Sequence, residues 1–368
     1  STTDPLGKAT NFVRDDDNRV LTVTDPNTNS IWFEYDGNGR LTSTENALFN
    51  KWKRQYDTDG RLKTESDPLG NETKYTYDAT FNTTAIRNPR GFTTTNTFDE
   101  VNRQITTSDP LGHTTTYSYD AASNRIAVTN PLNEIATATF DNNNRMTGQK
   151  SPLNLIATFA YDNIGNLVVA ANPLSQAVTS TYDVLNRKVA SENPLGLITS
   201  YSYDAANQQI AVTNPENETV AIAYDSAGRP QSETRPLNRI TTFSYDAVGR
   251  RTSITNPAGE ITTITYDPAG REIASVNPLG LITTFSYDNA NNRTGVTNPL
   301  DETVLTAYDA ANRVVAVRTP MGFITTTVYD KNSNVVLSIN PLNESVTTVY
   351  ADADRAISVI DPLGHIST

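Results

Sequence analysis

The chain has 368 residues, a formal net charge of −12 and no cysteine, and it contains no apolar stretch long enough to span a membrane as a helix. The acidic balance argues against nucleic acid and anionic membrane surfaces as partners, because both attract basic proteins. The absence of cysteine excludes disulfide bonds and thiolate metal ligands.

The dominant feature of the sequence is a 21-residue repeat without insertions or deletions. Proline recurs at this spacing from Pro5 to Pro362, and only Ala47 interrupts the series. A second series at the same spacing holds Tyr or Phe from Tyr35 to Tyr350, and Asp follows the aromatic residue in all these units except the last. A regular repeat of this length predicts an elongated array of stacked units rather than several globular domains.

Each unit contains two short segments with strand character, separated by turn residues. Residues 199–203, Thr-Ser-Tyr-Ser-Tyr, alternate bulky and small side chains, which is typical of a strand. The turn 204–208 follows, and the residue four positions after the aromatic is usually Gly or Asn, the types that tolerate a positive φ. A second strand follows over 210–213, and Asn-Pro-Leu-Gly then turns the chain back. The sequence therefore predicts an all-β fold with one antiparallel hairpin per repeat.

The sequence also has a longer period of 42 residues, which is two repeats. Six residues before the aromatic position, Leu197, Leu281 and Phe323 alternate with Glu or Gln, as at Glu134 and Gln176. Alternation of this kind indicates two unlike hairpins per structural unit. We predict a spiralling antiparallel β-ribbon, either a shell or a superhelix. The rival is a β-solenoid with 42-residue coils, in which strands would pair with partners 42 residues away.

Taken in chain order, the sequence predicts a single continuous array over residues 1–368. Residues 1–66 are less regular, with Trp32 and Trp52 in adjacent strands and Lys51 beside Trp52, whereas residues 67–368 are regular. The irregular part is either a binding edge or a region that packs against something else. The array begins and ends in the same phase of the repeat, so we expect open sheet ends that pair with another copy or with a further repeat chain.

The motif Tyr-Asp-x-x-Gly-Arg resembles the YD repeat of the RHS family. It is present over 35–40, 56–61, 224–229, 245–250 and 266–271, and the resemblance covers essentially the whole chain. The family includes Tc-toxin shell components, RHS polymorphic toxins, wall-associated proteins and teneurins. The resemblance implies a β-ribbon that spirals into a hollow shell, which encloses a C-terminal toxin domain or presents an adhesive surface. The self-cleaving core of the family has no recognisable counterpart in this sequence.

The turn aspartates resemble calcium loops only weakly, because each turn supplies one or two carboxylates where Ca²⁺ needs six or more oxygens. Turn capping explains them better, and only 15–17 and the pair Asp352 and Asp354 keep some similarity to a cation site. The position five after the aromatic always holds a side-chain hydrogen-bond donor, Arg, Asn or Gln. We expect this donor to contact carbonyls or the turn Asp of the adjacent hairpin.

No arrangement of residues in the sequence predicts an active site. His113 and His365 occupy the same variable repeat position without companion ligands, so a metal site is not expected. No Ser/His/Asp group, phosphate loop or dinucleotide fingerprint is present. We therefore predict no catalytic, cofactor-binding or metal-binding residues, no cofactor and no enzymatic activity.

The aromatic rows allow two interpretations, packing or glycan binding. A second ring lies two residues before the aromatic position in some repeats, as at Tyr75, Tyr117, Tyr201, Phe243 and Phe285. Packing is favoured, because paired rings stabilise cross-strand contacts. The sequence predicts an extracellular or cell-surface structural protein, a segment of an RHS-type shell or of a large bacterial secreted protein. The alternatives are a repeat block of an extracellular fibre and a glycan-binding adhesin.

Overall fold

The computed structural model describes all residues, 1–368, and shows one unclosed sheet of 36 antiparallel strands. Each strand pairs with the next strand along the chain, as in the pairings Ser200↔Thr213 within a repeat and Ala190↔Ser200 between repeats. The predicted hairpin ribbon is confirmed. The rival solenoid is wrong, because strand partners lie across the turns and not 42 residues away.

Two classes of strand alternate along the ribbon. The strands that end at the aromatic position, or at Arg14 in the first of them, are β2 (Ala9–Arg14), β4 (Ser30–Tyr35), β6 (Lys51–Tyr56), β8 (Glu72–Tyr77), β10 (Thr93–Phe98), β12 (Thr114–Tyr119), β14 (Ile135–Phe140), β16 (Ile156–Tyr161), β18 (Ala177–Tyr182), β20 (Ile198–Tyr203), β22 (Thr219–Tyr224), β24 (Arg239–Tyr245), β26 (Ile261–Tyr266), β28 (Ile282–Tyr287), β30 (Thr303–Tyr308), β32 (Ile324–Tyr329) and β34 (Ser345–Tyr350).

The strands that follow the Tyr-Asp turns are β3 (Val20–Thr24), β5 (Leu41–Glu45), β7 (Leu62–Ser66), β9 (Thr83–Arg87), β11 (Gln104–Ser108), β13 (Arg125–Thr129), β15 (Met146–Lys150), β17 (Leu167–Ala171), β19 (Lys188–Glu192), β21 (Gln209–Thr213), β23 (Pro230–Arg235), β25 (Arg251–Thr255), β27 (Glu272–Val276), β29 (Arg293–Thr297), β31 (Val314–Arg318), β33 (Val335–Ile339) and β35 (Ala356–Ile360). The short strands β1 (Thr2–Thr3) and β36 (Ile366–Ser367) are the outermost strands of the sheet, and a 3₁₀ turn, η1 (Pro236–Asn238), joins β23 to β24. No helix is long and apolar enough to cross a membrane.

Both kinds of turn have the same internal geometry, which explains the residues that they contain. In the turn after Asn193, the side-chain oxygen accepts hydrogen bonds from the backbone N–H groups of Leu195 and Leu197, and Gly196 has a φ of 76°. In the Tyr-Asp turn, the Asp183 carboxylate accepts the equivalent bonds from the backbone N–H groups of Leu185 and Arg187, and Asn186 has a φ of 62°. The fourth position therefore favours Gly or Asn because the backbone there is left-handed.

We name the two long edges of the ribbon after their turns. The Tyr-Asp edge comprises the turns that begin at residue 15 and every 21 residues to 351, and the Asn-Pro edge comprises those that begin at residue 4 and continue to 361. A β-bulge precedes the turn at the Tyr-Asp edge, where Ser202 pairs with Ala211 but Tyr203 pairs with Gln209. The Asn-Pro hairpins have no such shift. An extra residue at one edge bends and twists a strand pair, so this asymmetry curls the ribbon.

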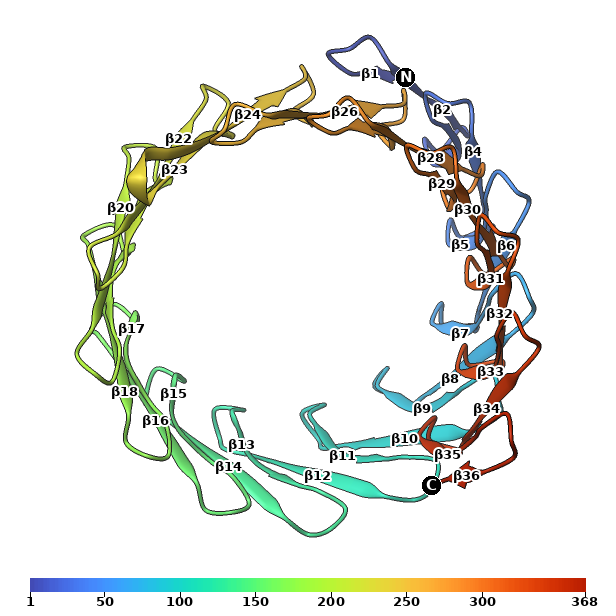
Figure 1. Cartoon of the computed structure of the whole chain (residues 1–368). Helices are drawn as coiled ribbons and strands as arrows, with labels where there is room; N and C mark the ends of the chain where they lie inside the picture. Colours follow the sequence, from blue (N-terminus) through green and yellow to red (C-terminus); the bar gives the residue numbers. More distant parts are fainter.

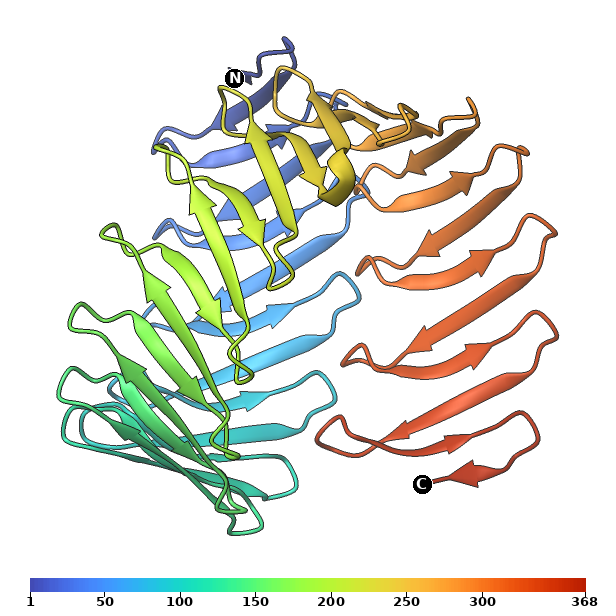
Figure 2. The same cartoon turned by 60° about the vertical axis from the view of Figure 1, so that its left-hand side comes forward.

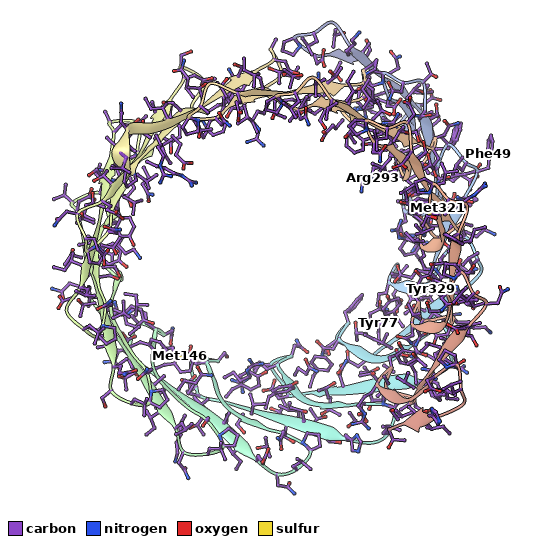
Figure 3. All side chains as sticks on the ribbon, in the orientation of Figure 1. Phe49, Tyr77, Met146, Arg293, Met321 and Tyr329 are labelled. Atoms are coloured by element: carbon purple, nitrogen blue, oxygen red, sulfur yellow. The ribbon has the colours of Figure 1, made fainter.

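The curled ribbon forms a spiral around an open centre (Figure 1). After one turn, strands β28 to β36 lie along the same arc as strands β2 to β10, and the two termini lie at opposite ends of the spiral axis (Figures 1 and 2). The centre stays open when every side chain is drawn (Figure 3). Tyr77 and Arg293 point toward this lumen, and Phe49 points outward.

The wall of the spiral is one sheet thick and has no conventional core. Only five residues are buried, and none of them is hydrophobic. Neighbouring hairpins are instead held together by the ladder and by side chains that cross between repeats. The hydroxyl of Tyr203 donates to the carbonyl of Lys188 at 2.8 Å, and the Arg187 guanidinium lies 4.7 Å from the centre of the Tyr203 ring. The aromatic series is therefore part of the packing between repeats.

The 42-residue period appears in the structure as two alternating kinds of turn at the Asn-Pro edge. From residue 130 onward, the turn Asn of every second repeat donates a hydrogen bond to a Glu carboxylate or a Gln amide oxygen, as in Asn130 to Glu134 at 2.7 Å and Asn172 to Gln176 at 2.8 Å. In the intervening repeats an apolar side chain such as Leu197 or Leu281 takes the same position and is close to half exposed. The two hairpin types therefore differ in how the Asn-Pro turn is held.

Candidate functional site at the seam between spiral turns

Where the ribbon has completed one turn, its two edges meet and form a seam. Residues of the Asn-Pro edge near the N-terminus contact residues of the Tyr-Asp edge that lie 240 to 264 positions later in the sequence. The contacts join the turns that begin at residues 25 and 88 to those that begin at 267, 330 and 351. The seam is thus the one place where distant repeats touch.

Arg90 provides most of the hydrogen bonds across the seam. Its Nη1 donates to the carbonyl of Ala351 at 3.0 Å and to Oδ1 of Asp354 at 2.9 Å, and its Nη2 donates to the carbonyl of Tyr350 at 3.2 Å. Its backbone N–H donates to Oδ1 of Asn332 at 3.1 Å. Only 19% of the Arg90 side chain is exposed, so these charge-assisted bonds are partly shielded from water.

Asp354 is the acceptor at the centre of this network. Besides Arg90, the Nδ2 atoms of Asn332 and Asn334 donate to its carboxylate. Burial alone would raise the pKa of Asp354, but the hydrogen bonds from Asn332, Arg90 and Asn334 outweigh burial and hold the pKa below its ordinary value. Asp354 is therefore charged at neutral pH and complements Arg90.

A second polar contact crosses the seam at its other end. Nδ2 of Asn27 donates to Oδ2 of Asp267 at 2.8 Å. Asp267 is 8% exposed, and it also accepts a hydrogen bond from Nε of Arg271 at 2.6 Å. Burial would raise the pKa of Asp267, and the bonds from Arg271 and Asn27 lower it below the ordinary value. The amide of Asn27 therefore adds a contact across the seam to the ion pair that Asp267 forms with Arg271 in its own turn.

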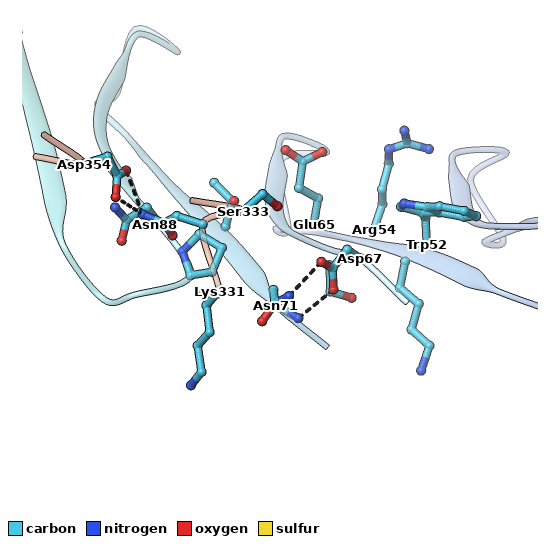
Figure 4. A pocket seen from close by; sticks show the side chains of 14 residues that line it. Trp52, Arg54, Glu65, Asp67, Asn71, Asn88, Lys331, Ser333 and Asp354 are labelled. Atoms are coloured by element: carbon cyan, nitrogen blue, oxygen red, sulfur yellow. Dashed lines mark hydrogen bonds between the residues drawn. The ribbon is translucent and has the colours of Figure 1, made fainter. Parts of the chain in front are cut away.

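A polar pocket of about 440 Å³ lies in the seam, and Asp354, the partner of Arg90, is one of the residues that line it (Figure 4). Its lining residues come from both turns of the spiral: Trp52, Lys53, Arg54, Glu65, Ser66, Asp67, Asn71, Thr73, Asn88, Pro89, Lys331, Asn332, Ser333 and Asp354. Acidic and basic side chains face it together, and Trp52 is its only large apolar group. A pocket with this lining can admit water and polar molecules.

The irregular N-terminal part contributes an aromatic pair next to the seam. The rings of Trp32 and Phe49 are stacked with centroids 5.8 Å apart, and Phe49 is 73% exposed. Lys51, which the sequence places beside Trp52, donates to Oε1 of Glu34 at 2.7 Å. Trp32 lies half-buried in β4 against exposed Phe49, and Trp52 lies in β6 and lines the seam pocket. The two tryptophans are not in adjacent strands as expected, because β5 separates β4 from β6.

The donor five positions after the aromatic contacts two hairpins. Nε of Arg187 donates to Oδ2 of Asp183 at 2.7 Å, and its Nη1 donates to the carbonyl of Asp204 at 3.1 Å. The carbonyl is in the next hairpin, as expected, but the carboxylate belongs to the same turn and not to its neighbour. In other repeats Asn replaces Arg, and Asn124 donates to Asp120 and to Asn144.

The acidic clusters and histidines have partners within the protein. Arg19 pairs with Asp15 at 2.7 Å and with Asp17 at 2.8 Å. His113 and His365 each approach the aspartate that begins their own turn, through Nδ1 at 3.0 Å and 2.8 Å. No three His, Cys, Asp or Glu side chains come together in a geometry that could hold a metal ion. Asp15 and Asp17 therefore hold a turn, and Asp354 holds the seam.

Sequence reasoning did not identify Arg90 and Asn27 as contact residues. Both occupy the position directly after the proline, which holds Leu in most repeats. A polar residue at a position that is otherwise apolar is the signal that could have singled them out. The turns that Arg90 and Asn27 contact could not have been predicted in this way, because the residues of a repeat do not reveal how many repeats make up one turn of the spiral.

Two family models match the sequence and together cover most of it. The Teneurin YD-shell model matches residues 188–365, and the RHS Repeat model matches residues 14–48, 56–93 and 98–135. A search of curated proteins gave no match.

Several solved structures share the fold at low sequence identity. They include a crystal structure of TcdB2-TccC3-TEV (TM-score 0.72, 14% identity, 95% of this chain and 24% of that one) and the Photorhabdus luminescens Tc holotoxin pore with a TccC3 mutation (TM-score 0.73, 14% identity, 95% and 24%). A crystal structure of TcdB2-TccC3 without its hypervariable C-terminal region gives a TM-score of 0.72 at 15% identity, over 96% and 26% of the two chains. This chain therefore spans about a quarter of the length of the solved chains that it matches.

Proposed function

This chain belongs to the RHS/YD-repeat family, and from that premise we propose that it is a non-enzymatic wall segment of a hollow shell. The observation that carries the proposal is the ribbon itself, which is one sheet thick and curls around an open centre (Figure 3). Such a wall separates two spaces and leaves room for contents. Its fold is that of Tc toxin components, although the sequence identity of about 14% supports the fold alone.

We place the segment in an extracellular toxin or in a large bacterial surface or secreted protein. The side chains that face the lumen support a role in enclosing a polypeptide. Tyr77 points into the lumen, and strand alternation puts Tyr75 on the same face. Arg293 also points into the lumen, and its guanidinium carbon lies 5.6 Å from the centre of the Phe285 ring. A lining of rings and guanidinium groups offers weak contacts to an enclosed chain, such as a toxin domain, without a specific pocket.

Single-cysteine labelling tests whether the wall shelters its lumen. The natural chain has no cysteine, so Arg293→Cys and Phe49→Cys each place one thiol, on the inner and the outer face. We expect a small maleimide to label both variants and a maleimide coupled to a bulky polymer to label Phe49→Cys several-fold faster. Equal rates with the bulky reagent would show that the lumen is not sheltered and would contradict the shell function.

A second candidate function is glycan binding, and the stack of half-buried Trp32 with exposed Phe49 is the observation that favours it. Exposed aromatic faces pack well against the C–H faces of sugar rings, and the seam pocket with its polar side chains lies close to Phe49's repeat. A glycan array with the intact chain and with Trp32→Ala tests it. Binding that disappears in Trp32→Ala supports an adhesin, and the absence of any binding by the intact chain removes this candidate.

A further inference from the structure

A second cavity, of about 240 Å³, adjoins the seam pocket and is lined by polar residues, glycine and proline. Its charged side chains are three cations, Lys74, Arg87 and Lys331, and one carboxylate, Glu72. The whole chain has 41 acidic and 29 basic residues, so an excess of positive charge in one cavity runs against its composition. We name this space the cationic cavity.

Two of the three cations lie directly opposite each other in the strand ladder. Lys74 of β8 pairs with Arg87 of β9, and like charges in directly opposed positions destabilise a strand pair. No other repeat has two charged side chains at these positions, and the pair Thr116↔Thr129 shows the uncharged alternative. The like-charge pair is therefore a departure from the repeat that needs a counter-charge.

The protein itself supplies little of that counter-charge. The one ion pair among the lining residues joins Nζ of Lys74 to Oε2 of Glu72 at 3.0 Å, and it is weak because both side chains are about half exposed. Nε of Arg87 donates to the carbonyl of Gly91 at 3.0 Å, which leaves its Nη1 and Nη2 groups for a ligand. A Cβ on Gly91 would lie 3.2 Å from Nη2, so glycine leaves room for the guanidinium.

The cationic cavity joins two spiral turns on the outer face of the wall. Tyr77 points into the lumen, so strand alternation puts Lys74 on the outer face, with Arg87 opposite it. Lys331 comes from the second spiral turn. It points away from the side of the sheet that carries Arg54, which lies two residues before the aromatic position and is therefore on the inner face (Figure 4).

The carboxylates of the adjoining seam pocket already have partners. Asp67 accepts hydrogen bonds within its own turn, and Asp354 is held by Arg90 and two asparagines. Glu65 accepts a hydrogen bond from the hydroxyl of Tyr75, which is on the inner face. The positive charge of the cationic cavity is therefore left for a ligand.

We propose that the cationic cavity binds a phosphate or sulfate group, either as the free ion or as the end of a small molecule. The free N–H groups of Arg87 form a fork that fits two oxygens of such a group, and the ammonium groups of Lys74 and Lys331 add charge. The bound group neutralises the opposed cations and connects the first spiral turn to the second. This site does not depend on the shell function.

Isothermal titration calorimetry with inorganic phosphate and with sulfate, at an ionic strength held constant with sodium chloride, tests the site. The first variant carries Lys74→Thr and Arg87→Thr, which install the pair that Thr116 and Thr129 form naturally. The second variant is Lys331→Ala, and alanine is common at this position of the repeat. Both variants are therefore compatible with the fold.

The matched control carries Lys150→Thr and Arg318→Thr, which remove two cations from the ladder position of Arg87 in other repeats. The wild-type chain and the control are expected to bind equally, and each cavity variant at least about tenfold more weakly. Absence of binding to the wild-type chain overturns the proposal, and so does an equal loss in the control. Unchanged affinity in Lys331→Ala contradicts a ligand that connects the two spiral turns.

Two further measurements extend the test. Phosphate should slow hydrogen exchange of the amides in 330–334 in the wild-type chain and the control, and unchanged exchange would contradict the connection between spiral turns. Titration with glucose 6-phosphate separates the two sources of the group. Tighter binding than inorganic phosphate supports a phosphorylated small molecule as the ligand, and binding that is no tighter supports the free ion.

Discussion

The unit on which this protein depends is a set of three side chains shared by two neighbouring hairpins. Asp183 caps its own turn and accepts from Arg187, Arg187 reaches the next turn and lies over the ring of Tyr203, and Tyr203 donates back to the first hairpin. Each contact is exposed or half-buried and therefore weak by itself. Because these contacts recur along the ribbon, together they supply the stability that a hydrophobic core supplies in a globular domain.

Substitution of Tyr203 separates the contribution of the hydroxyl from that of the ring. Tyr203→Phe removes the bond to the Lys188 carbonyl and should lower the free energy of unfolding by about 1 kcal/mol. Tyr203→Ala also removes the ring from beneath Arg187 and should cost about 3 kcal/mol. Urea unfolding followed by circular dichroism measures both. Tyr201→Phe is the matched control, since no protein group accepts from its hydroxyl, and a loss as large as that of Tyr203→Phe would refute this assignment.

The turn aspartates predict a loss of stability in acid. Hydrogen bonds from the backbone and the side chain of Arg187 hold the pKa of Asp183 below its ordinary value, and the bonds of Arg40 do the same for the pKa of Asp36. A carboxyl whose pKa is lower in the folded state stabilises the fold above the unfolded pKa, and this contribution is lost as the pH falls through the folded value. Melting temperatures should therefore be steady from neutral pH to about 5 and fall steeply below about 4.

An Asp183→Asn variant checks the origin of the acid sensitivity. It keeps the turn hydrogen bonds that an amide oxygen can accept, as the Asn-Pro turns do naturally, but it cannot titrate. The variant should melt at a lower temperature than the wild type at pH 7 and lose less stability on acidification. A melting profile in acid that is parallel to that of the wild type would assign the effect to other carboxyl groups.

At the scale of the hairpin, much of the structure can be read from the sequence. The residues of 199–203 and 210–213 predict strands, and the Gly or Asn in the fourth turn position predicts the left-handed backbone that Gly196 and Asn186 adopt. The bulge beside Tyr203 could not be predicted, because nothing in the side chains distinguishes the extra residue. Since curvature comes from that bulge, the radius of the spiral and the partners of Arg90 were also beyond the sequence.

Arg90 allows a direct test of the seam. Arg90→Ala should leave the circular-dichroism spectrum unchanged, because no hairpin depends on Arg90, and should weaken the seam by on the order of 1 kcal/mol. Hydrogen exchange of the amides in 330–334 and 350–354 should become several-fold faster. Met321→Ala is the control, since Met321 takes the same repeat position in the second spiral turn and is 82% exposed. Exchange that rises equally in both variants would show that Arg90 does not hold the seam.

The whole molecule is an open spiral and not a closed ring. Its sheet has two free ends, at β1 and β36, and its edges meet only through side chains and turns. The fold class, the repeat register and the family follow from the sequence, whereas the meeting of two ribbon edges is a property of the assembled spiral. The candidate site lies at that seam and was therefore absent from the sequence-based prediction.

Deletion of one complete hairpin, residues 193–213, distinguishes an open spiral from a closed ring. In an open spiral each hairpin contributes a fixed curvature, so the particle diameter in small-angle X-ray scattering should stay the same while the spiral becomes shorter by one unit. The seam would move by one hairpin and lose the pairing of Arg90 with Asp354, so the melting temperature should fall. A diameter that shrinks in proportion to the lost hairpin would show that the ribbon closes on itself.

The distance of 240 residues between Asn27 and Asp267 also sets an order of events during synthesis. Each hairpin finds its partners among residues that have just left the ribosome, so the wall can grow strand by strand at its C-terminal rim with only local contacts. At a typical synthesis rate the second half of the seam emerges roughly ten seconds to a minute after the first. Throughout that interval the Asn-Pro turns of the first spiral turn are uncovered. On a crowded polysome they are the surface that other growing chains meet first.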